Sequence, residues 1–314
     1  MTRFDVPEGF SWSASRHGTF SDCARAYFFR YYGSLGKADP PLPPGRRREA
    51  WRLRHLTSVP MWIGSRVHGA IEGILKAVRR GEEVDVDGEI ERMVDGMRRD
   101  YDASRRDLAR LRDDPRRHVR FVEHEYGIEV PPDEWRAQVG AAREMVRAFA
   151  DGGWLDRFRS LDPGEVLALE DLDRWDFEGV PVWVRIDAAW RNPDGRVTIV
   201  DWKTGRRERE DNPLQLLGYA AYARDRWGVD LGALEVLEVY LRRDPPEKAC
   251  RVDEETVENG RQVIRDSVRS MLEVLPDPSR DAAAEDRCPP RPGQYRCTYC
   301  PFRSLCEAGK EFVG

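Results

Sequence analysis

Lysine is scarce in this sequence, and its scarcity draws attention to one position. The 314 residues include 52 lysines and arginines, but only five of these are lysine. They are Lys37, Lys76, Lys203, Lys248 and Lys310. Lys203 follows the apolar stretch VTIV in VTIVDWKTG, two residues after Asp201. Because the chain otherwise favours arginine for positive charge, a lysine at this strand end indicates a role for a compact, tunable ammonium.

The sequence also lacks a long apolar segment. No run of about 18 apolar residues occurs, so no transmembrane helix is expected. The first residues, MTRFDVPEGFSWSAS, do not show the charged, apolar and small-residue pattern of a signal peptide. With 40% hydrophobic and 35% charged residues, the composition is typical of a globular protein without a membrane partner. We therefore expect a cytoplasmic location.

Motor motifs and a uniformly basic surface are lacking as well. No G-x-x-x-x-G-K-S/T motif occurs, so any helicase that works with this chain would have to be a partner. The net charge of −5 argues against a basic coat for nucleic acid, although local patches remain. Residues 46–54 and 98–120 are rich in arginine. The second stretch is either a solvated helix with i,i+4 ion pairs or a surface that contacts phosphates.

Apolar periodicity predicts a mixture of helices and strands. Helices are expected over residues 11–33, 61–80, 88–112, 134–151, 212–228 and 253–275, with Asn212 capping the fifth. Strands are expected within residues 165–172, 180–190, 196–203 and 234–243. The fold class is therefore α/β (α+β). We expect an N-terminal segment at 1–60, a helical region at 61–160, a core at 161–280 and a cysteine-rich module at 281–314.

Two acids flank a predicted hairpin. If Arg191 and Arg196 pair across the turn at residues 192–195, Asp187 falls opposite Val200, within a rung or two of Asp201. Lys203 points to the same face as Asp201 because side chains alternate along a strand. Close carboxylates repel unless a cation neutralises them, and their hard oxygens suit Mg²⁺ or Mn²⁺. The alternative is a surface hairpin with ordinary charges beside its turn.

Four other polar residues lie on a face of a predicted helix or at the end of a predicted strand. His68 belongs to the apolar stripe of the second helix, and Gly64, one turn earlier, allows another backbone to approach closely. Gln215 and Tyr219 are spaced i,i+4 and share a helix face. Glu170 ends the apolar run VLALE. Each of these residues alone is more typical of a core edge than of a site.

The ordered motifs GSRVH, RIDAAW, IVDWKTG and QLLGYAAY resemble the RecB-type branch of the PD-(D/E)XK nuclease superfamily. The chain is similar to the AddB nuclease domain and to CRISPR-associated RecB-like exonucleases over residues 11–308. The resemblance implies a restriction-endonuclease-like core with a central mixed sheet flanked by helices. It also implies that His68, Asp187 and Asp201 bind the metal and that Lys203 is the catalytic lysine. Gln215 and Tyr219 would support the site and contact the DNA backbone.

Six cysteines are present, and three form the tight pattern C-x₂-C-x₅-C at Cys297, Cys300 and Cys306. This spacing suits a metal better than a disulfide and needs a fourth ligand. Cys23 and Cys288 could each serve as this ligand, and periodicity does not choose between them. The resemblance favours Cys23 and a 4Fe–4S cluster, whereas Cys288 would complete a local Zn²⁺ site. Cys250 is expected to be only a small buried side chain.

Together these observations predict a metal-dependent DNA nuclease. The resemblance implies an exonuclease or a flap- or end-processing enzyme on single-stranded DNA, in DNA repair, CRISPR adaptation or phage defence. A helicase or a component of CRISPR adaptation would then be its partner. The alternative is a non-catalytic or weakly catalytic DNA-binding subunit of a larger complex on the same fold.

Overall fold

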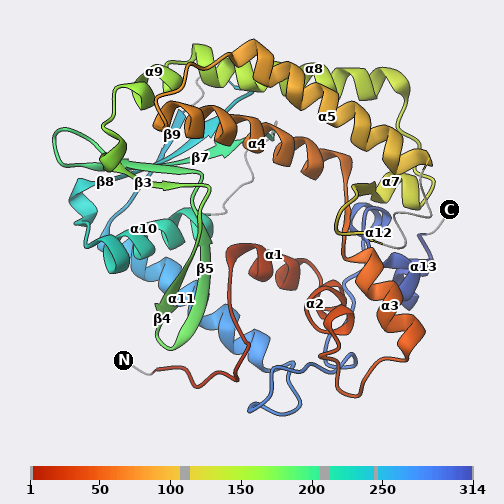
Figure 1. Cartoon of the computed structure of the whole chain (residues 1–314). Coiled ribbons are helices and arrows are strands. Elements are labelled where there is room, and N and C mark those ends of the chain that lie inside the picture. The colour runs from red at the N-terminus through yellow and green to blue at the C-terminus, as the bar shows by residue number, and fades with distance from the viewer. Residues whose placement is uncertain (1–2, 107–113, 206–212, 244–246, 313–314) are drawn as a thin grey trace.

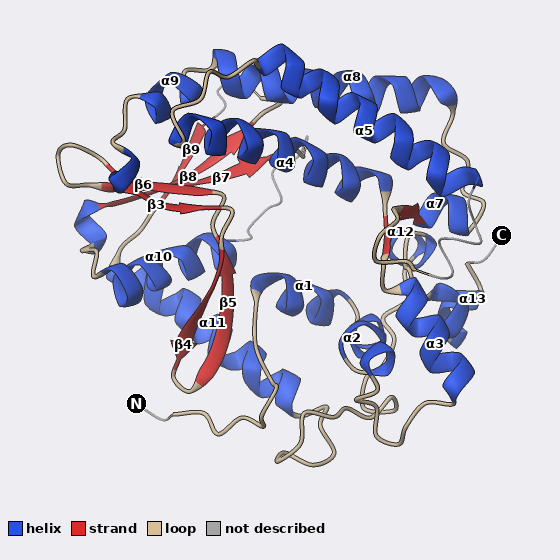
Figure 2. Ribbon diagram, viewed as in Figure 1, coloured by secondary structure: helices blue, strands red, loops and turns tan. Residues whose placement is uncertain are grey.

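The computed structural model of the chain describes residues 3–106, 114–205, 213–243 and 247–312. At its centre lies a five-stranded sheet in the order β3–β6–β7–β8–β9 (Figures 1 and 2). Its strands are β3 (Val166–Leu169), β6 (Ala188–Arg191), β7 (Val197–Lys203), β8 (Leu234–Tyr240) and β9 (Glu247–Cys250). Strands β7 and β8 run parallel, and the other neighbours run antiparallel. The mixed sheet confirms the expected α/β (α+β) fold class.

Helices cover both faces of this sheet (Figure 1). One face packs against α4 (Val59–Arg79), α5 (Val86–Arg106), α8 (Pro132–Asp151) and α9 (Trp154–Arg159). The other face packs against α10 (Pro213–Trp227) and α11 (Glu254–Leu272). Val200 and Trp202 of β7 belong to the first core, and Val197 and Ile199 belong to the second. Because side chains alternate along a strand, Asp201 faces the α10 side.

A long hairpin bends out of the sheet. Strands β4 (Leu172–Phe177) and β5 (Val180–Arg185) form a separate two-stranded ribbon that continues β3 and β6 without a change of register. The predicted single strand at 180–190 is therefore wrong, because the chain leaves one sheet and enters the other at residues 186–187. Trp12 makes a parallel bridge to Val182 and covers the outer edge of the ribbon.

The two ends of the chain pack against each other. The N-terminal part forms α1 (Ala14–Asp22), α2 (Ala24–Tyr31) and α3 (Pro44–Leu53), and the C-terminal part forms α12 (Gln294–Thr298) and α13 (Glu307–Lys310). The rings of Phe29 and Phe302 lie 5.7 Å apart. Glu285 accepts hydrogen bonds from Arg25 at 3.0 Å and from Arg46 at 2.5 Å. The predicted helix at 11–33 is thus two helices, which meet at Cys23.

The remaining elements are short. Strands β1 (Leu56–Thr57) and β2 (Arg120–Phe121) pair in parallel, and α7 (Val122–Glu125) follows directly. Single 3₁₀ turns lie at Gly33–Leu35, Pro163–Glu165, Leu231–Ala233 and Arg303–Leu305. The other predicted helices match α4, α5, α8, α10 and α11 within a few residues, although Asn212 and residues 107–112 lie outside the described part. None of the described helices is long and apolar enough to cross a membrane.

The basic stretches are largely paired with acids where the structure describes them. Within residues 98–120, Arg98 pairs with Asp95 and Arg117 pairs with Asp114, each three residues away. These pairs favour the interpretation as a solvated charged surface over a dedicated phosphate-contacting surface. Within residues 46–54, Arg46 forms an ion pair with Glu285, where the two chain ends pack against each other.

Candidate metal centre and active site

Four acids lie in one row across neighbouring strands. Leu169 pairs with Ala188 and Leu172 pairs with Arg185, so the same register sets Glu170 opposite Asp187. Ala188 pairs with Val200, and this register sets Asp187 opposite Asp201. The parallel pairing of β7 with β8 then sets Asp201 beside Glu238. The row is therefore Glu170, Asp187, Asp201 and Glu238, at the edge where the long hairpin bends out of the sheet.

The predicted hairpin register is wrong by one residue. Asn192 donates its backbone N–H to Arg196 at 2.7 Å, so the loop contains three residues rather than four. Gly195 has a φ of +84°, the left-handed conformation that such three-residue loops use. The odd loop length moves Asp187 from opposite Val200 to opposite Asp201. The two acids are consequently closer than the sequence pattern alone predicts.

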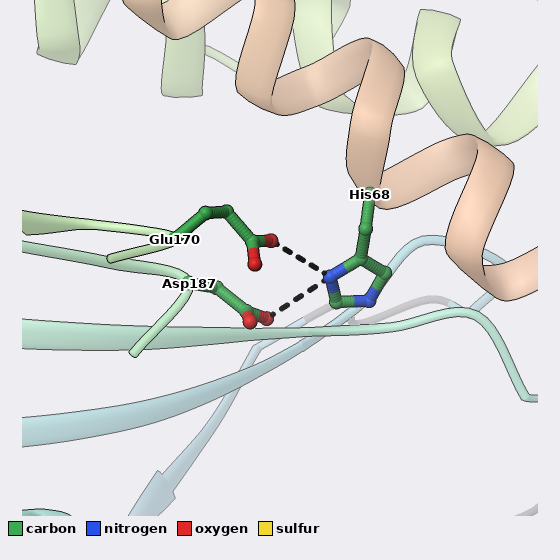
Figure 3. A group of neighbouring side chains, drawn as sticks. All are labelled: His68, Glu170 and Asp187. Atoms are coloured by element: carbon green, nitrogen blue, oxygen red, sulfur yellow. Dashed lines mark hydrogen bonds and ion pairs between the residues drawn. The ribbon is translucent and has the colours of Figure 1, made fainter. Parts of the chain in front are cut away.

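Glu170 occupies a strained position at the bend. Its φ of +55° lies in the left-handed region, which is uncommon for a residue other than glycine. Its backbone N–H donates to the carbonyls of Ile186 at 2.9 Å and Asp187 at 3.1 Å. This conformation turns the Glu170 carboxylate toward His68, where Oε1 lies 3.1 Å from Nδ1 (Figure 3). Strain of this kind concentrates at functional sites.

His68 reaches the acids from α4, on the other side of the bend. Its Nε2 lies 2.9 Å from the carbonyl oxygen of Trp202, which can only accept, so Nε2 carries a hydrogen. Nδ1 therefore faces Glu170 and Asp187, whose Oδ2 is 3.5 Å away (Figure 3). A neutral imidazole would point a lone pair at two carboxylates, so this arrangement needs a proton or a cation at Nδ1. Metal-binding histidines are commonly held by such a bond from the other ring nitrogen.

Close approach of α4 to the sheet end depends on Gly64, as its position one turn before His68 predicts. A Cβ at Gly64 would lie 3.0 Å from Oγ1 of Thr204, just after β7. An alanine there would require Oγ1 of Thr204 to shift by a few tenths of an ångström. The glycine therefore helps to hold His68 within reach of Trp202 and the acids.

The donor set fits a divalent cation. Donor atoms of His68, Glu170 and Asp187 all lie within 4.8 Å of one another, and the side chains of the two acids are only 7% and 8% exposed. Burial alone would lower the pKa of His68, but its interactions with Asp187 and Glu170 raise it to about 10. Burial and the charge of Asp187 raise the pKa of Asp201 to about 6. Hard oxygens with excess negative charge and one imidazole suit Mg²⁺ or Mn²⁺.

Lys203 lies between two acids of the row. Its Nζ contacts the Asp201 carboxylate and lies 3.6 Å from Oε1 of Glu238. Burial opposes the ammonium form, but the charges of Asp201 and Glu238 raise the pKa of Lys203. Lys203 is therefore held as a fixed positive charge beside the candidate metal centre. The sequence pattern did not single out Glu238, because its closeness to Lys203 depends on the pairing of β7 with β8.

Gln215 and Tyr219 reach the same acid from α10. Gln215 Nε2 donates to Asp201 Oδ1 at 3.1 Å and to the Tyr219 hydroxyl at 2.6 Å. The Tyr219 hydroxyl donates to the carbonyl of Arg185 at 2.7 Å, at the end of β5. In this structure the two residues fix Asp201 and the bend of the hairpin. Asp201 thus contacts Lys203, Gln215 and Tyr219. The donor atoms that lie close enough together to share a cation belong to His68, Glu170 and Asp187.

Four cysteines from the two chain ends, Cys23, Cys297, Cys300 and Cys306, line the same cavity. Cys23 lies between α1 and α2, and its Sγ accepts the backbone N–H of Arg291 at 3.4 Å. Burial raises the pKa of the Cys300 thiol to about 12, and the nearby thiols of Cys23, Cys297 and Cys306 add to the shift. Cys288 is fully buried, and burial raises its pKa to about 12. Cys250 makes a long contact to the carbonyl of Arg251 and lies on β9.

Replacing Glu170 with glutamine tests the donor set directly. Glu170→Gln keeps the shape of the side chain but removes one negative charge from the group around His68. We expect Mn²⁺ binding by the protein without DNA to weaken by at least about tenfold, measured by calorimetry or electron paramagnetic resonance.

Glu178→Gln is a matched control for that variant. Glu178 also has a left-handed backbone, with a φ of +53°, and its side chain is only 9% exposed, but it pairs with Arg265 far from His68 along the ribbon. Mn²⁺ binding should be unchanged in this variant. Equal losses in both variants would show that the effect of Glu170 is structural.

Comparison with known families agrees with a nuclease core of this kind. A model of the PD-(D/E)XK nuclease superfamily matches residues 11–307. The chain belongs to the PD-(D/E)XK nuclease superfamily. Members of this superfamily are generally nucleases that use Mg²⁺ or Mn²⁺, so the family indicates metal-dependent nuclease activity with DNA as substrate.

Other comparisons add little to this assignment. No curated protein matches the chain. Among solved structures, one titled "Crystal structure of SSO0001" is 17% identical and covers 60% of this chain and 79% of that chain. Its TM-score of 0.28 is too low to support an argument about fold or function.

Proposed function

We propose that the chain is a deoxyribonuclease of the RecB-type branch that requires Mg²⁺ or Mn²⁺ and acts on single-stranded DNA from a free end or at a flap. The observation that carries this proposal is the meeting of His68 Nδ1 with two buried carboxylates beside the ion pair of Asp201 and Lys203. Ordinary surface hairpins do not bury several acids around one imidazole. The same grouping favours an active enzyme over a non-catalytic assembly subunit.

Each residue of the site has a distinct part in the proposed hydrolysis. Glu170, Asp187 and His68 would hold the divalent cation, with Asp201 completing the acidic group. A cation bound there would supply Lewis-acid stabilisation of the charge that develops on the phosphate. Lys203 Nζ would orient the attacking water and offset negative charge in the transition state. Gln215 would hold Asp201 in position and contact the DNA backbone, whereas Tyr219, which is buried, would hold Gln215 and the end of β5 in place.

A 4Fe–4S cluster held by Cys23, Cys297, Cys300 and Cys306 is part of the proposal. The support is that all four cysteines line the same cavity, together with the contact between the chain ends through Glu285. The cluster would supply a cross-link between the N-terminal helices and the C-terminal module. A Zn²⁺ site that uses Cys288 is the alternative, and metal analysis distinguishes the two.

Metal dependence and substrate form test the proposed activity together. Labelled linear single-stranded DNA should be degraded in Mg²⁺ or Mn²⁺ and remain intact with a chelator. Linear duplex DNA should be degraded more slowly, and circular single-stranded DNA should resist if a free end is required. Persistence of the linear single strand under every metal condition would overturn the proposal in favour of the assembly subunit.

A partner that delivers the single strand fits this activity. A helicase or a CRISPR adaptation complex would present the DNA end. We propose such a partner on the basis of the substrate form alone.

A further inference from the structure

Exposed apolar side chains gather in the cavity that contains the candidate active site. Within the described residues, six large apolar side chains are exposed: Leu35, Met61, Leu172, Trp183, Val263 and Tyr295. Four of them, Leu35, Met61, Leu172 and Trp183, line one cavity of about 1500 Å³. The same cavity is lined by His68, Glu170 and Asp187. Exposed apolar groups concentrated in one place indicate a binding surface.

Two of these residues lie on one face of the β4–β5 ribbon. Trp183 is 40% exposed and Leu172 is 58% exposed. Trp183 pairs with Arg174 across the ribbon, and Leu172 pairs with Arg185. Because alternate residues share a face, Trp183 and Arg185 point the same way. The exposed face of the ribbon therefore alternates apolar and cationic side chains.

This face is held on a rigid backbone. Trp183 donates its backbone N–H to the carbonyl of Trp12 at 2.8 Å, and Trp12 donates its own backbone N–H to the carbonyl of Pro181 at 2.8 Å, which completes the bridge to Val182. The indole of Trp12 is buried and donates to Ser267 on α11 at 2.9 Å. The ribbon is thus anchored on its outer edge, while the Trp183 ring stays accessible. Figure 1 shows the ribbon projecting from the sheet beside α1.

The ribbon leads directly into the row of acids. Arg185 Nε lies 4.0 Å from Glu170 Oε2, and its side chain is 62% exposed. Asp187 follows two residues later. At about 3.3 Å per residue, Trp183 lies no more than roughly 13 Å along the chain from Asp187. A polymer that follows this face would meet the indole first, then the guanidinium, then the candidate metal centre.

We propose that this ribbon face binds the bases of single-stranded DNA a few nucleotides from the cleaved bond, with Trp183 as a base-stacking platform and Arg185 as a phosphate contact. The assignment rests on the proposed nuclease function and names the part of the site that selects single strands. A single strand offers both unstacked bases and phosphates, which match the alternation of indole and guanidinium. A duplex keeps its bases inside and would set Trp183 and Leu172 against phosphates, so it is disfavoured.

The test uses abasic sites to locate the stacked base. Single-stranded oligonucleotides carry one abasic residue at successive positions, and their binding is measured by fluorescence anisotropy without added divalent metal. Trp183→Ala should weaken binding of the intact oligonucleotide by about 5- to 100-fold, and Trp183→Phe should restore most of it. In wild type, one abasic position should cost a similar factor, and in Trp183→Ala that position should cost nothing further.

A matched control and a cleavage measurement separate this inference from the proposed function. Val263→Ala removes an exposed apolar side chain that does not line the cavity, and binding should be unchanged. Cleavage by wild type together with normal binding by Trp183→Ala would overturn the inference alone. Loss of binding in Trp183→Ala with no cleavage by wild type would support the ribbon site and overturn the nuclease proposal. The ribbon site would also be overturned if the abasic position weakened binding to Trp183→Ala as much as it weakens binding to wild type. Stable binding of a protein segment, but not of DNA, to this face would overturn it as well.

Discussion

Replacing Lys203 with methionine is expected to lower the rate of DNA cleavage by at least about 100-fold, with little change in DNA binding. Methionine keeps the length and packing of the lysine stem but removes the ammonium that contacts Asp201 and Glu238. Asp187→Asn and Asp201→Asn should cause losses of the same order, because each removes a charge from the row of acids. Single-turnover rates on labelled single-stranded DNA in Mn²⁺ measure the effect.

The control for this prediction is the integrity of the site. Removal of Lys203 leaves Asp201 without its nearest cation, and a buried acid without a partner destabilises a fold. Thermal unfolding and anisotropy without added divalent metal must therefore show a folded, DNA-binding variant. Lys310→Met is a suitable comparison, since Lys310 is an exposed lysine paired with Glu307 on α13. Wild-type cleavage by folded Lys203→Met would rule out a catalytic part for the ammonium.

Cys23→Ser is expected to remove most of the bound iron and to lower the apparent melting temperature by roughly 10 °C. Cys23 and Cys297 are far apart in sequence, so a cluster that joins them closes a very long loop of the unfolded chain. Without it, the contact between the chain ends depends on Phe29, Phe302 and the ion pairs of Glu285. Iron content and visible absorption of anaerobically purified protein measure the loss of the cluster.

Two other cysteines provide controls for the cluster. Cys288→Ala removes a fully buried thiol, and Cys250→Ala removes one on β9. Both variants should keep their iron, and Cys250→Ala should also keep its melting temperature. If Cys288→Ala loses the metal while Cys23→Ser retains it, the ligands belong to a local site. Stoichiometric zinc in place of iron would also exclude the proposed cluster.

Most of the secondary structure could be predicted because it depends on short-range periodicity. The apolar stripe from Ile63 to Val78 is a local pattern, and it became α4 with only small shifts at its ends. Periodicity does not predict the two interruptions, at Cys23 and at residues 186–187. Neither has a helix- or strand-breaking residue to mark it. Each arises where the chain turns to meet a distant segment, the C-terminal module in one case and Glu170 in the other.

The sequence predicts which residues belong to the candidate site better than it predicts how they are arranged. Asp201 and Lys203 share a face because they are two residues apart on one strand, and this holds for any register. Gln215 and Tyr219 reach Asp201 together because they are four residues apart on one helix. The place of Glu170 in the site could not be predicted, since a lone acid at a strand end gives no hint of a left-handed backbone. Glu238 had no signal, because its neighbour Lys203 belongs to another strand.

The sequence by itself determined the fold class, the D-x-K chemistry on β7 and the tight cysteine spacing, all of which depend on residues close together in the chain. Tertiary structure alone decided the row of acids, the direction of His68 Nδ1 and the exposure of Trp183. The physical reason is that these features depend on register and on a bend. A loop of three residues rather than four moved Asp187 opposite Asp201, and the strained turn at Glu170 brought its carboxylate to His68. The contact of Glu170 with His68 joins residues 102 positions apart, and the position of Asp187 opposite Asp201 depends on a single residue of loop length, so no local pattern in the sequence encodes either.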